Sequence, residues 1–140
     1  MQPDRIQTAK PRPHQTCLIV EDSDFDREKL TRIMQKSNHP FHIEAATTLK
    51  LARRVMEKAP VSLILLDNNL PDGLGADFAL ELARDANYAD IPVIIISDWP
   101  SPFMWEKASS AGVAFVLSKT EFDRRYVHAV FQKDPSNLVN

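Results

Sequence analysis

The sequence contains only three glycines, Gly73, Gly75 and Gly112, among its 140 residues. Dinucleotide-binding folds and P-loop enzymes cluster several glycines in one loop, so that backbone N–H groups can surround a phosphate. Because the sequence has no such loop, we expect neither of these two nucleotide-binding sites.

Cysteine is almost absent as well: Cys17 is the single one, and the formal net charge is only −2 at pH 7. One cysteine cannot form a disulfide within the chain, which is typical of proteins from reducing compartments. Cys17 lies in an apolar run, where we expect a buried thiol. Nucleic-acid-binding proteins usually carry a strong basic excess, so the charge balance predicts no nucleic-acid partner.

Long apolar runs are also lacking, since none approaches the ~20 residues that a membrane-spanning helix requires. Residues 1–15 contain three prolines and mixed charges, but not the apolar core of a signal peptide. We therefore expect a cytoplasmic protein without membrane contact. Its expected parts are a flexible N-terminal arm at 1–15, one domain at 16–133 and a polar tail at 134–140.

Five short apolar segments alternate with segments of helical periodicity. The segments expected to form strands are 16–20, 41–45, 61–66, 93–96 and 113–117. Residues of types that favour helix N-caps precede several of the helical segments, among them Ser23, Thr48, Ser101 and Thr120. Strands that alternate with helices predict a parallel sheet with right-handed crossovers and helices on both faces.

The third predicted strand contains four consecutive apolar residues, Leu63 to Leu66, and ends at Asp67. A continuous apolar run predicts a strand buried on both faces, and Pro71 and Gly73 then turn the chain. A carboxylate at the end of a buried strand is costly if it is only structural. Since ligands bind at the carboxyl ends of strands in open α/β sheets, Asp67 is the first candidate reactive residue.

Polar residues follow all the strands expected at the centre of the sheet: Glu21 and Asp22, then Asp67, Ser97 and Lys119. Because parallel strands end at one edge, these side chains should meet in one cleft. Clustered carboxylates repel each other, and a single lysine cannot neutralise three of them. A Mg2+ ion would complete such a site and could also bind phosphate oxygens. The cluster therefore indicates phosphoryl chemistry, with Asp67 as the nucleophile.

These motifs resemble those of the receiver domain of bacterial two-component response regulators. The matching segments are Val20-Glu21-Asp22, Leu65 to Gly73, Ile95-Ile96-Ser97 and Val116 to Lys119. Each segment is short, but all four occur in the right order, and each lies at a strand end. The resemblance covers residues 16–132. It implies a stand-alone receiver with the flavodoxin-like (βα)5 fold, a doubly wound parallel sheet with strand order 2-1-3-4-5.

The resemblance also implies how phosphate and metal would be bound. Asp67 matches the phosphoacceptor, which takes a phosphoryl group from a histidine kinase or a histidine phosphotransfer protein. Asp22 matches a direct Mg2+ ligand, and Glu21 matches a neighbour that acts through water. Asn69 matches the position whose backbone carbonyl completes the metal site together with Asp67.

Two further residues match the machinery that responds to the phosphoryl group. Lys119 matches the lysine that binds a phosphoryl oxygen, and Ser97 matches the hydroxyl residue that moves toward the phosphate. The resemblance thus implies a signalling protein that catalyses only its own phosphorylation and dephosphorylation. Its output would be either a changed contact with a downstream protein, which the sequence does not identify, or transfer of the phosphoryl group in a phosphorelay.

Three positions depart from the family pattern. Thr120 stands where receivers often carry proline, and Val116 stands where many carry a switching aromatic residue. Phe115 beside it should face the opposite side of the sheet. Asp98 stands where a small neutral residue is usual. It could face the cleft and disfavour added negative charge, or it could point away and cap the loop before Pro100.

Two other functions therefore stay open. A degenerate receiver would act as a phosphorylation-independent binding module, which the departures at positions 98, 116 and 120 would allow. A small Mg2+-dependent phosphohydrolase would use Asp67 as its nucleophile. Such enzymes usually need a second acid just beyond the nucleophile, whereas Asn69 stands two residues on.

Phe103, Met104 and Trp105 are consecutive in the fourth predicted helix. Side chains at three successive helical positions cannot all face the core, so we expect at least one to be exposed. An exposed aromatic residue here could belong to a partner surface. It could equally belong to a homodimer formed through the fourth helix, the fifth strand and the fifth helix.

Overall fold

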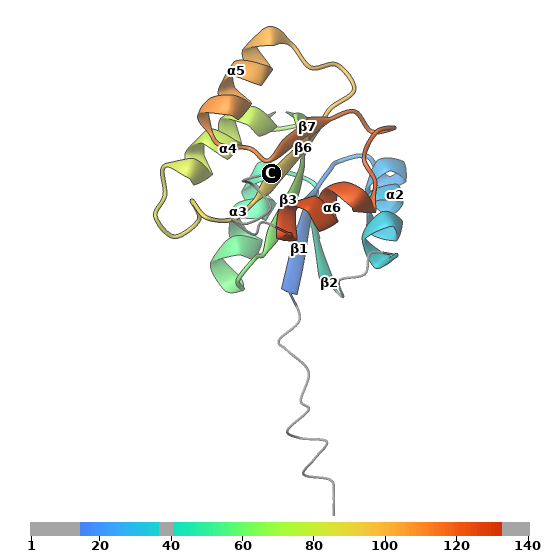
Figure 1. Cartoon of the computed structure of the whole chain (residues 1–140). Coiled ribbons are helices and arrows are strands. Elements are labelled where there is room, and N and C mark those ends of the chain that lie inside the picture. The colour runs from blue at the N-terminus through green and yellow to red at the C-terminus, as the bar shows by residue number, and fades with distance from the viewer. Residues whose placement is uncertain (1–14, 37–40, 133–140) are drawn as a thin grey trace, which may run out of the picture.

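The computed structural model describes residues 15–36 and 41–132, which form a five-stranded parallel sheet between two layers of helices (Figure 1). The strands are β1 (Gln15–Val20), β2 (Phe41–Ala46), β3 (Leu63–Asp67), β6 (Val93–Ile96) and β7 (Phe115–Leu117). Their order in the sheet is β2-β1-β3-β6-β7. This is the flavodoxin-like order 2-1-3-4-5, so the predicted fold is confirmed. The expected arm and tail lie outside the described residues, except that Gln15 begins β1.

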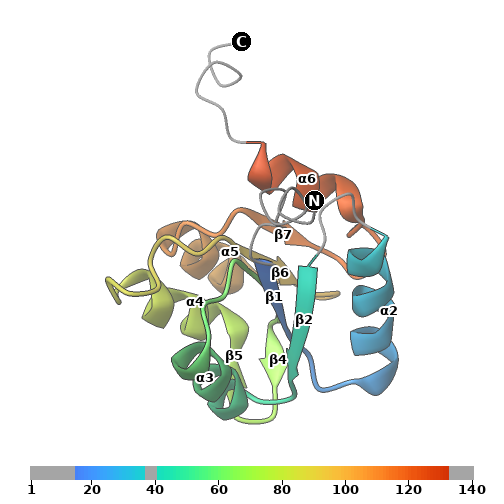
Figure 2. The ribbon, with the colours of Figure 1, turned by 90° about the horizontal axis from the view of Figure 1, so that it is seen from below.

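The central strands are apolar because helices cover both of their faces (Figure 2). One face packs against α3 (Leu49–Lys58), α4 (Gly75–Ala83) and α5 (Pro102–Ser110), and the other against α2 (Asp24–Gln35) and α6 (Arg124–Phe131). Along β3, Ile64 and Leu66 face the first layer, whereas Leu63 and Leu65 face the second. Cys17 is fully buried, as predicted, and burial raises the pKa of its thiol.

Three of the predicted helix caps are confirmed. At Ser23, Thr48 and Ser101, the side-chain oxygen accepts a hydrogen bond from the backbone N–H three residues later, at 3.1–3.3 Å. Each cap satisfies one of the N–H groups that the first turn of a helix leaves without a partner. These residues therefore set where α2, α3 and α5 begin.

The last helix begins later than predicted. The cap expected at Thr120 is wrong, because Asp123 caps α6 and accepts a hydrogen bond from the N–H two residues on at 2.8 Å. Residues before it form a separate turn, in which the Glu121 side chain accepts from the Ser118 N–H at 2.8 Å. β7 is also shorter than the predicted strand at 113–117, since the N–H at its expected start bonds to the end of α5 instead.

A small antiparallel hairpin follows β3 and was not predicted. Its strands are β4 (Asn69–Leu70) and β5 (Gly73–Leu74). Two-residue strands are too short to show a periodic pattern in the sequence. The hairpin also carries Asp72, whose carboxylate accepts hydrogen bonds from the N–H groups of Leu49 and Lys50 at 2.9 and 3.0 Å. It thereby joins the end of β3 to the start of α3.

The start of α4 is attached directly to the end of β3. The Asn68 carbonyl accepts from the Gly75 N–H at 2.8 Å, and the Asn68 side chain accepts from the Ala76 N–H at 2.9 Å. A Cβ atom on Gly75 would lie 2.3 Å from the carbonyl oxygen of Asp67. Only glycine therefore permits this close approach, which holds the chain around Asp67 in place.

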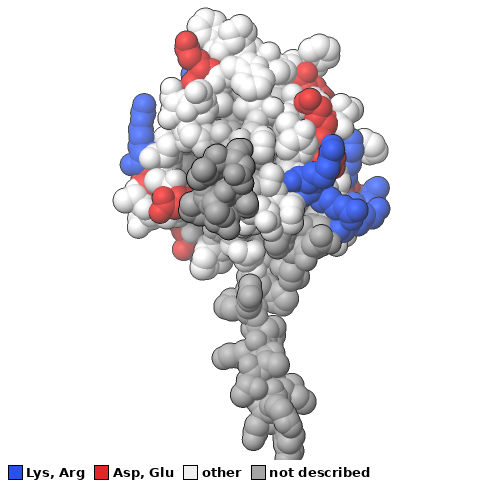
Figure 3. Space-filling model, in the orientation of Figure 1, with Lys and Arg blue, Asp and Glu red and all other residues white. Residues whose placement is uncertain are grey.

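The face of the molecule seen in Figure 1 carries both positively and negatively charged side chains (Figure 3). Figure 3 shows Lys and Arg side chains gathered on the side where α2 and α6 lie. Here Arg124 of α6 donates a hydrogen bond to the carbonyl of Lys36 at the end of α2, at 3.2 Å.

No helix within residues 15–36 and 41–132 is long and apolar enough to cross a membrane.

Candidate functional site

Three carboxylates meet at the carboxyl ends of β1 and β3, which are neighbours in the sheet. Glu21 and Asp22 directly follow β1, and Asp67 is the last residue of β3. One oxygen from each residue lies within 4.8 Å of the others. Glu21 is 1% exposed and Asp67 is 7% exposed, whereas Asp22 is open to solvent. The structure thus brings these three residues together, as expected for parallel strands that end at one edge.

Burial changes the titration of the two inner carboxyl groups. Loss of water raises the pKa of Glu21 to about 7, and the nearby charge of Asp67 adds to the rise. A hydrogen bond from the Ser23 N–H and the charge of Lys119 oppose it only in part. The pKa of Asp67 is also raised, mainly by burial. The protonated form of both groups is therefore favoured in the absence of a cation, and a bound cation would favour their ionised form.

The acidic cluster has the chemistry of a site for a hard divalent cation. Glu21 Oε2 accepts from the Ser23 N–H at 3.1 Å. Glu21 Oε1 is buried and has no hydrogen-bond partner in the described part of the chain, although Lys119 Nζ lies 3.3 Å away. Carboxylate oxygens are the ligands that Mg2+ and Mn2+ prefer. The residues present therefore fit such an ion.

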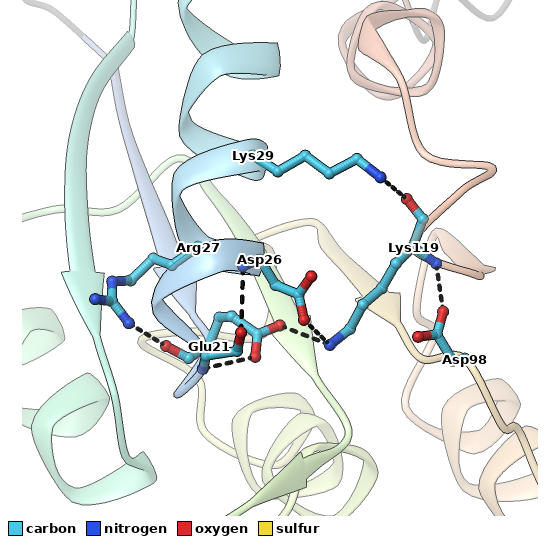
Figure 4. Close-up of polar contacts among 7 residues, drawn as sticks. Glu21, Asp26, Arg27, Lys29, Asp98 and Lys119 are labelled. Carbon is cyan, nitrogen blue, oxygen red and sulfur yellow. Dashed lines mark hydrogen bonds and ion pairs between the residues drawn. The ribbon is translucent and has the colours of Figure 1, made fainter.

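Lys119 reaches this cluster from the loop between β7 and α6 (Figure 4). Its Nζ lies 2.7 Å from Asp26 Oδ2 and 3.3 Å from Glu21 Oε1. Burial acts to lower the pKa of the Lys119 ammonium, but these carboxylates and the charge of Asp67 outweigh that effect and raise it. Within the described ranges, no ion pair joins Lys119 to Asp67. The ammonium is at the site, but it is bound on the side of α2.

The backbone of Lys119 is held on both sides as well. Asp98 Oδ1 accepts from the Lys119 N–H at 3.1 Å, and Lys29 Nζ donates to the Lys119 carbonyl at 3.2 Å (Figure 4). The sequence left open whether Asp98 faces the cleft or caps the loop before Pro100, and its hydrogen bond to the Lys119 N–H corresponds to neither of these roles alone. Its carboxylate binds the loop that carries Lys119, which the sequence alone could not indicate.

Ser97 directly follows β6, at the same edge of the sheet. It is 1% exposed, and its backbone N–H donates to the Leu117 carbonyl of β7 at 2.8 Å. In the part of the chain that the structure describes, its Oγ has no hydrogen-bond partner. Buried hydroxyl groups without a partner are uncommon. This one can donate to a group that arrives at the site.

Asn69 and Thr120 lie at the border of the site. Asn69 is exposed at the start of β4, and its backbone N–H stabilises the charge of Asp67. That its carbonyl binds a metal stays a prediction. The hydroxyl of Thr120, where receivers often have proline, lies 3.1 Å from the hydroxyl of Ser118 in the turn before α6.

The side chains of β7 point as predicted. Val116 packs on the face covered by α3, α4 and α5. Phe115 lies on the opposite face, where its ring meets that of Tyr126 edge-on, with centroids 5.1 Å apart. An aromatic switch residue therefore does not occupy the usual position on this strand.

Three residues near the site were not singled out from the sequence: Asp26, Lys29 and Asn68. Asp26 lies in the first turn of α2, where acidic residues are favoured by the helix dipole in any protein. That common pattern gave no reason to expect a contact with Lys119. Asn68 follows Asp67 directly, but its capping role depends on where α4 begins in space.

Comparison with known proteins agrees with this geometry. A family model described as "Response regulator receiver domain" matches residues 17–131. Two-component response regulator ORR3 from Oryza sativa subsp. indica is 27% identical over 114 residues, which cover 79% of this chain and 82% of that protein.

Solved structures are similar in fold. The Mn(2+)-bound form of response regulator Rcp1 has a TM-score of 0.70 at 22% identity, and the match covers 83% of this chain and 88% of that one. The phosphorylated cyanobacterial phytochrome response regulator RcpA has a TM-score of 0.71 at 21% identity, over 84% of this chain and 89% of that one.

Proposed function

The chain belongs to the response regulator receiver domain family, and from this premise we propose that it accepts a phosphoryl group on the carboxylate of Asp67. The observation that carries the proposal is the position of this residue. Asp67 is buried at the end of β3, within 4.8 Å of two other carboxylates. Ser97 lies at the end of the neighbouring strand with an unpartnered hydroxyl group, within the described part of the chain.

The reaction is a transfer between two side chains. In the proposed donor, a histidine kinase or a histidine phosphotransfer protein, the bond between phosphorus and the imidazole nitrogen breaks. A bond forms between phosphorus and an Asp67 oxygen, and the electron pair of the broken bond stays on the histidine. Because a protonated carboxyl group is a poor nucleophile, and burial raises the pKa of Asp67, this carboxyl group must be ionised before the transfer.

Glu21, Asp22, Asp67 and the carbonyl of Asn69 would hold Mg2+, with Glu21 acting through water. The ion, when bound, supplies positive charge that neutralises the carboxylates and the transferred group. Glu21 Oε1 supports this assignment, because it is buried and has no hydrogen-bond partner among residues 15–36 and 41–132. Lys119 would bind a phosphoryl oxygen, and the Ser97 hydroxyl would donate to another.

The consequence of phosphorylation would be a change in protein contacts rather than the conversion of a further substrate. Ser97 moves toward the phosphoryl group, and the chain shifts between two conformations around α5 and β7. A downstream protein would distinguish these conformations. In this proposal the chain catalyses only the gain and loss of its own phosphoryl group.

Incubation with Mg2+ and acetyl phosphate tests the proposal. We expect a labile adduct of one phosphoryl group, detected by intact-protein mass spectrometry, which is absent in Asp67→Asn and when EDTA removes the metal. A wild-type protein that forms no adduct would be a binding module instead. Rapid turnover of varied phosphate esters would indicate a phosphohydrolase.

A further inference from the structure

The ammonium group of Lys119 is bound by a residue outside the acidic cluster. Asp26 Oδ2 lies 2.7 Å from Lys119 Nζ, which is closer than the 3.3 Å that separates this nitrogen from Glu21 Oε1. Figure 4 shows the Lys119 side chain extended toward the first turn of α2. In the described part of the chain, Asp67 takes no part in these ion pairs.

Asp26 differs from the other acidic residue in the first turn of α2, because its partner lies on a different element. Asp24 belongs to the same turn of α2, but its side chain is 91% exposed and pairs with the neighbouring Arg27. The Asp26 side chain is only 24% exposed, and its partner Lys119 is 93 residues away in the sequence. The contact between Asp26 and Lys119 is therefore part of the tertiary structure.

We propose that Asp26 is a positioning residue that holds the Lys119 ammonium on the α2 side of the unphosphorylated protein, so that an incoming phosphoryl group must compete with Asp26 for it. This inference rests on the proposed function of Asp67. The backbone of Lys119 stays bound to Asp98 and Lys29, so the side chain can change partner while the loop keeps its place.

Competition between Asp26 and the phosphoryl group for Lys119 should lower the affinity of the site for that group. The pair between Asp26 and Lys119 stabilises the protein before the phosphoryl group arrives, and it is lost or weakened afterwards. A contact that stabilises only the unoccupied state lowers the apparent affinity for the occupant. Removing the charge of Asp26 should therefore strengthen the binding of a phosphoryl group or its mimic.

Beryllofluoride with Mg2+ is a suitable probe, because it mimics the phosphoryl group on aspartate without a covalent reaction step. Asp26→Asn keeps the size of the side chain and removes its charge, while Asp24→Asn makes the same change of net charge in the same turn without touching Lys119. We expect Asp26→Asn to bind beryllofluoride roughly 3- to 10-fold more tightly than wild type, and Asp24→Asn to change affinity less than about 2-fold. Asp26→Glu, which keeps the charge, should return the affinity toward the wild-type value.

A second measurement reports on the position of the lysine itself. In protein labelled with 13C-lysine, the Lys119 side-chain signal is assigned by its loss in Lys119→Gln. In Asp26→Asn without beryllofluoride, we expect this signal to move toward its position in the wild-type complex. An unmoved signal, or an equal gain of affinity in Asp24→Asn, would overturn the role of Asp26 and leave phosphorylation of Asp67 intact. If the wild type binds no beryllofluoride, both the proposed function and this inference are wrong.

Discussion

At the level of single residues, burial makes ionisation of the Glu21 carboxyl group unfavourable. Its carboxyl group is buried at the end of β1, and its pKa lies at about 7 rather than at 4.5. Between these two pH values, the folded chain keeps a proton that the unfolded chain has already released. The contribution of Glu21 to stability is therefore fully present below about pH 4.5 and is lost as the pH rises through about 7.

The loss of this stabilising contribution at higher pH gives a prediction for Glu21→Gln. The variant keeps the shape of the side chain but cannot lose a proton. Without divalent metal, we expect the variant to gain stability over wild type by about 1–3 kcal/mol as the pH rises from about 5 to 8. Urea denaturation in EDTA at several pH values measures the difference. Parallel curves for the two proteins would contradict the prediction. Saturating Mg2+ should reduce the difference, because it stabilises the ionised wild-type site.

At the level of elements, the site depends on how α4 joins β3. Leu74 is the N-cap of α4, but its side chain cannot accept a hydrogen bond, and Asn68 supplies the acceptor for the Ala76 N–H instead. Asn68 is buried beside Asp67. The same side chain therefore begins the helix and fixes the segment that carries the reactive carboxylate.

We predict that Asn68→Ala lowers the free energy of unfolding by about 1–2 kcal/mol, because a buried N–H group loses its partner. Asn87→Ala is a matched control, since Asn87 is exposed in the loop before β6. Urea denaturation of both variants measures the effect. Equal stability of the two variants would show that the Asn68 side chain does not act as the cap.

At the level of the whole molecule, the α5 surface is distinctive. Phe103 is 75% exposed and Trp105 is 51% exposed, whereas Met104 between them is buried. This confirms the expectation that three consecutive apolar residues could not all face the core. Exposed aromatic side chains of this size are common at protein interfaces. That they form a homodimer surface with β7 and α6 stays a prediction.

If α5 contributes to a dimer, Phe103→Ser should weaken the self-association that beryllofluoride and Mg2+ induce, by roughly 10-fold or more for an aromatic residue at the centre of an interface. Phe25→Ser is the matched control, because Phe25 is 76% exposed on α2, outside the predicted dimer surface. Sedimentation velocity with and without beryllofluoride measures the change. Equal effects in both variants, or in neither, would exclude this surface.

Much of this protein could be derived from the sequence, because the decisive patterns are local. Continuous apolar runs such as Leu63 to Leu66 identify strands that are covered on both faces. Parallel strands end at the same edge, so the residues that follow them must come together there. For this reason the sequence alone assigns Glu21, Asp22 and Asp67 to one cluster, and the three carboxylates do meet.

The partners of the remaining side chains were decided only by the tertiary structure. Lys119 was expected at the site, but its contact with Asp26 joins positions 93 residues apart. Asp98 binds the Lys119 N–H across 21 residues, and α6 begins later than expected because the side chain of Glu121 closes a turn of its own. Periodicity places a residue on an element and at an edge of the sheet. The partner of its charged group depends on how elements that are distant in the sequence pack against each other, and the sequence pattern does not show that packing.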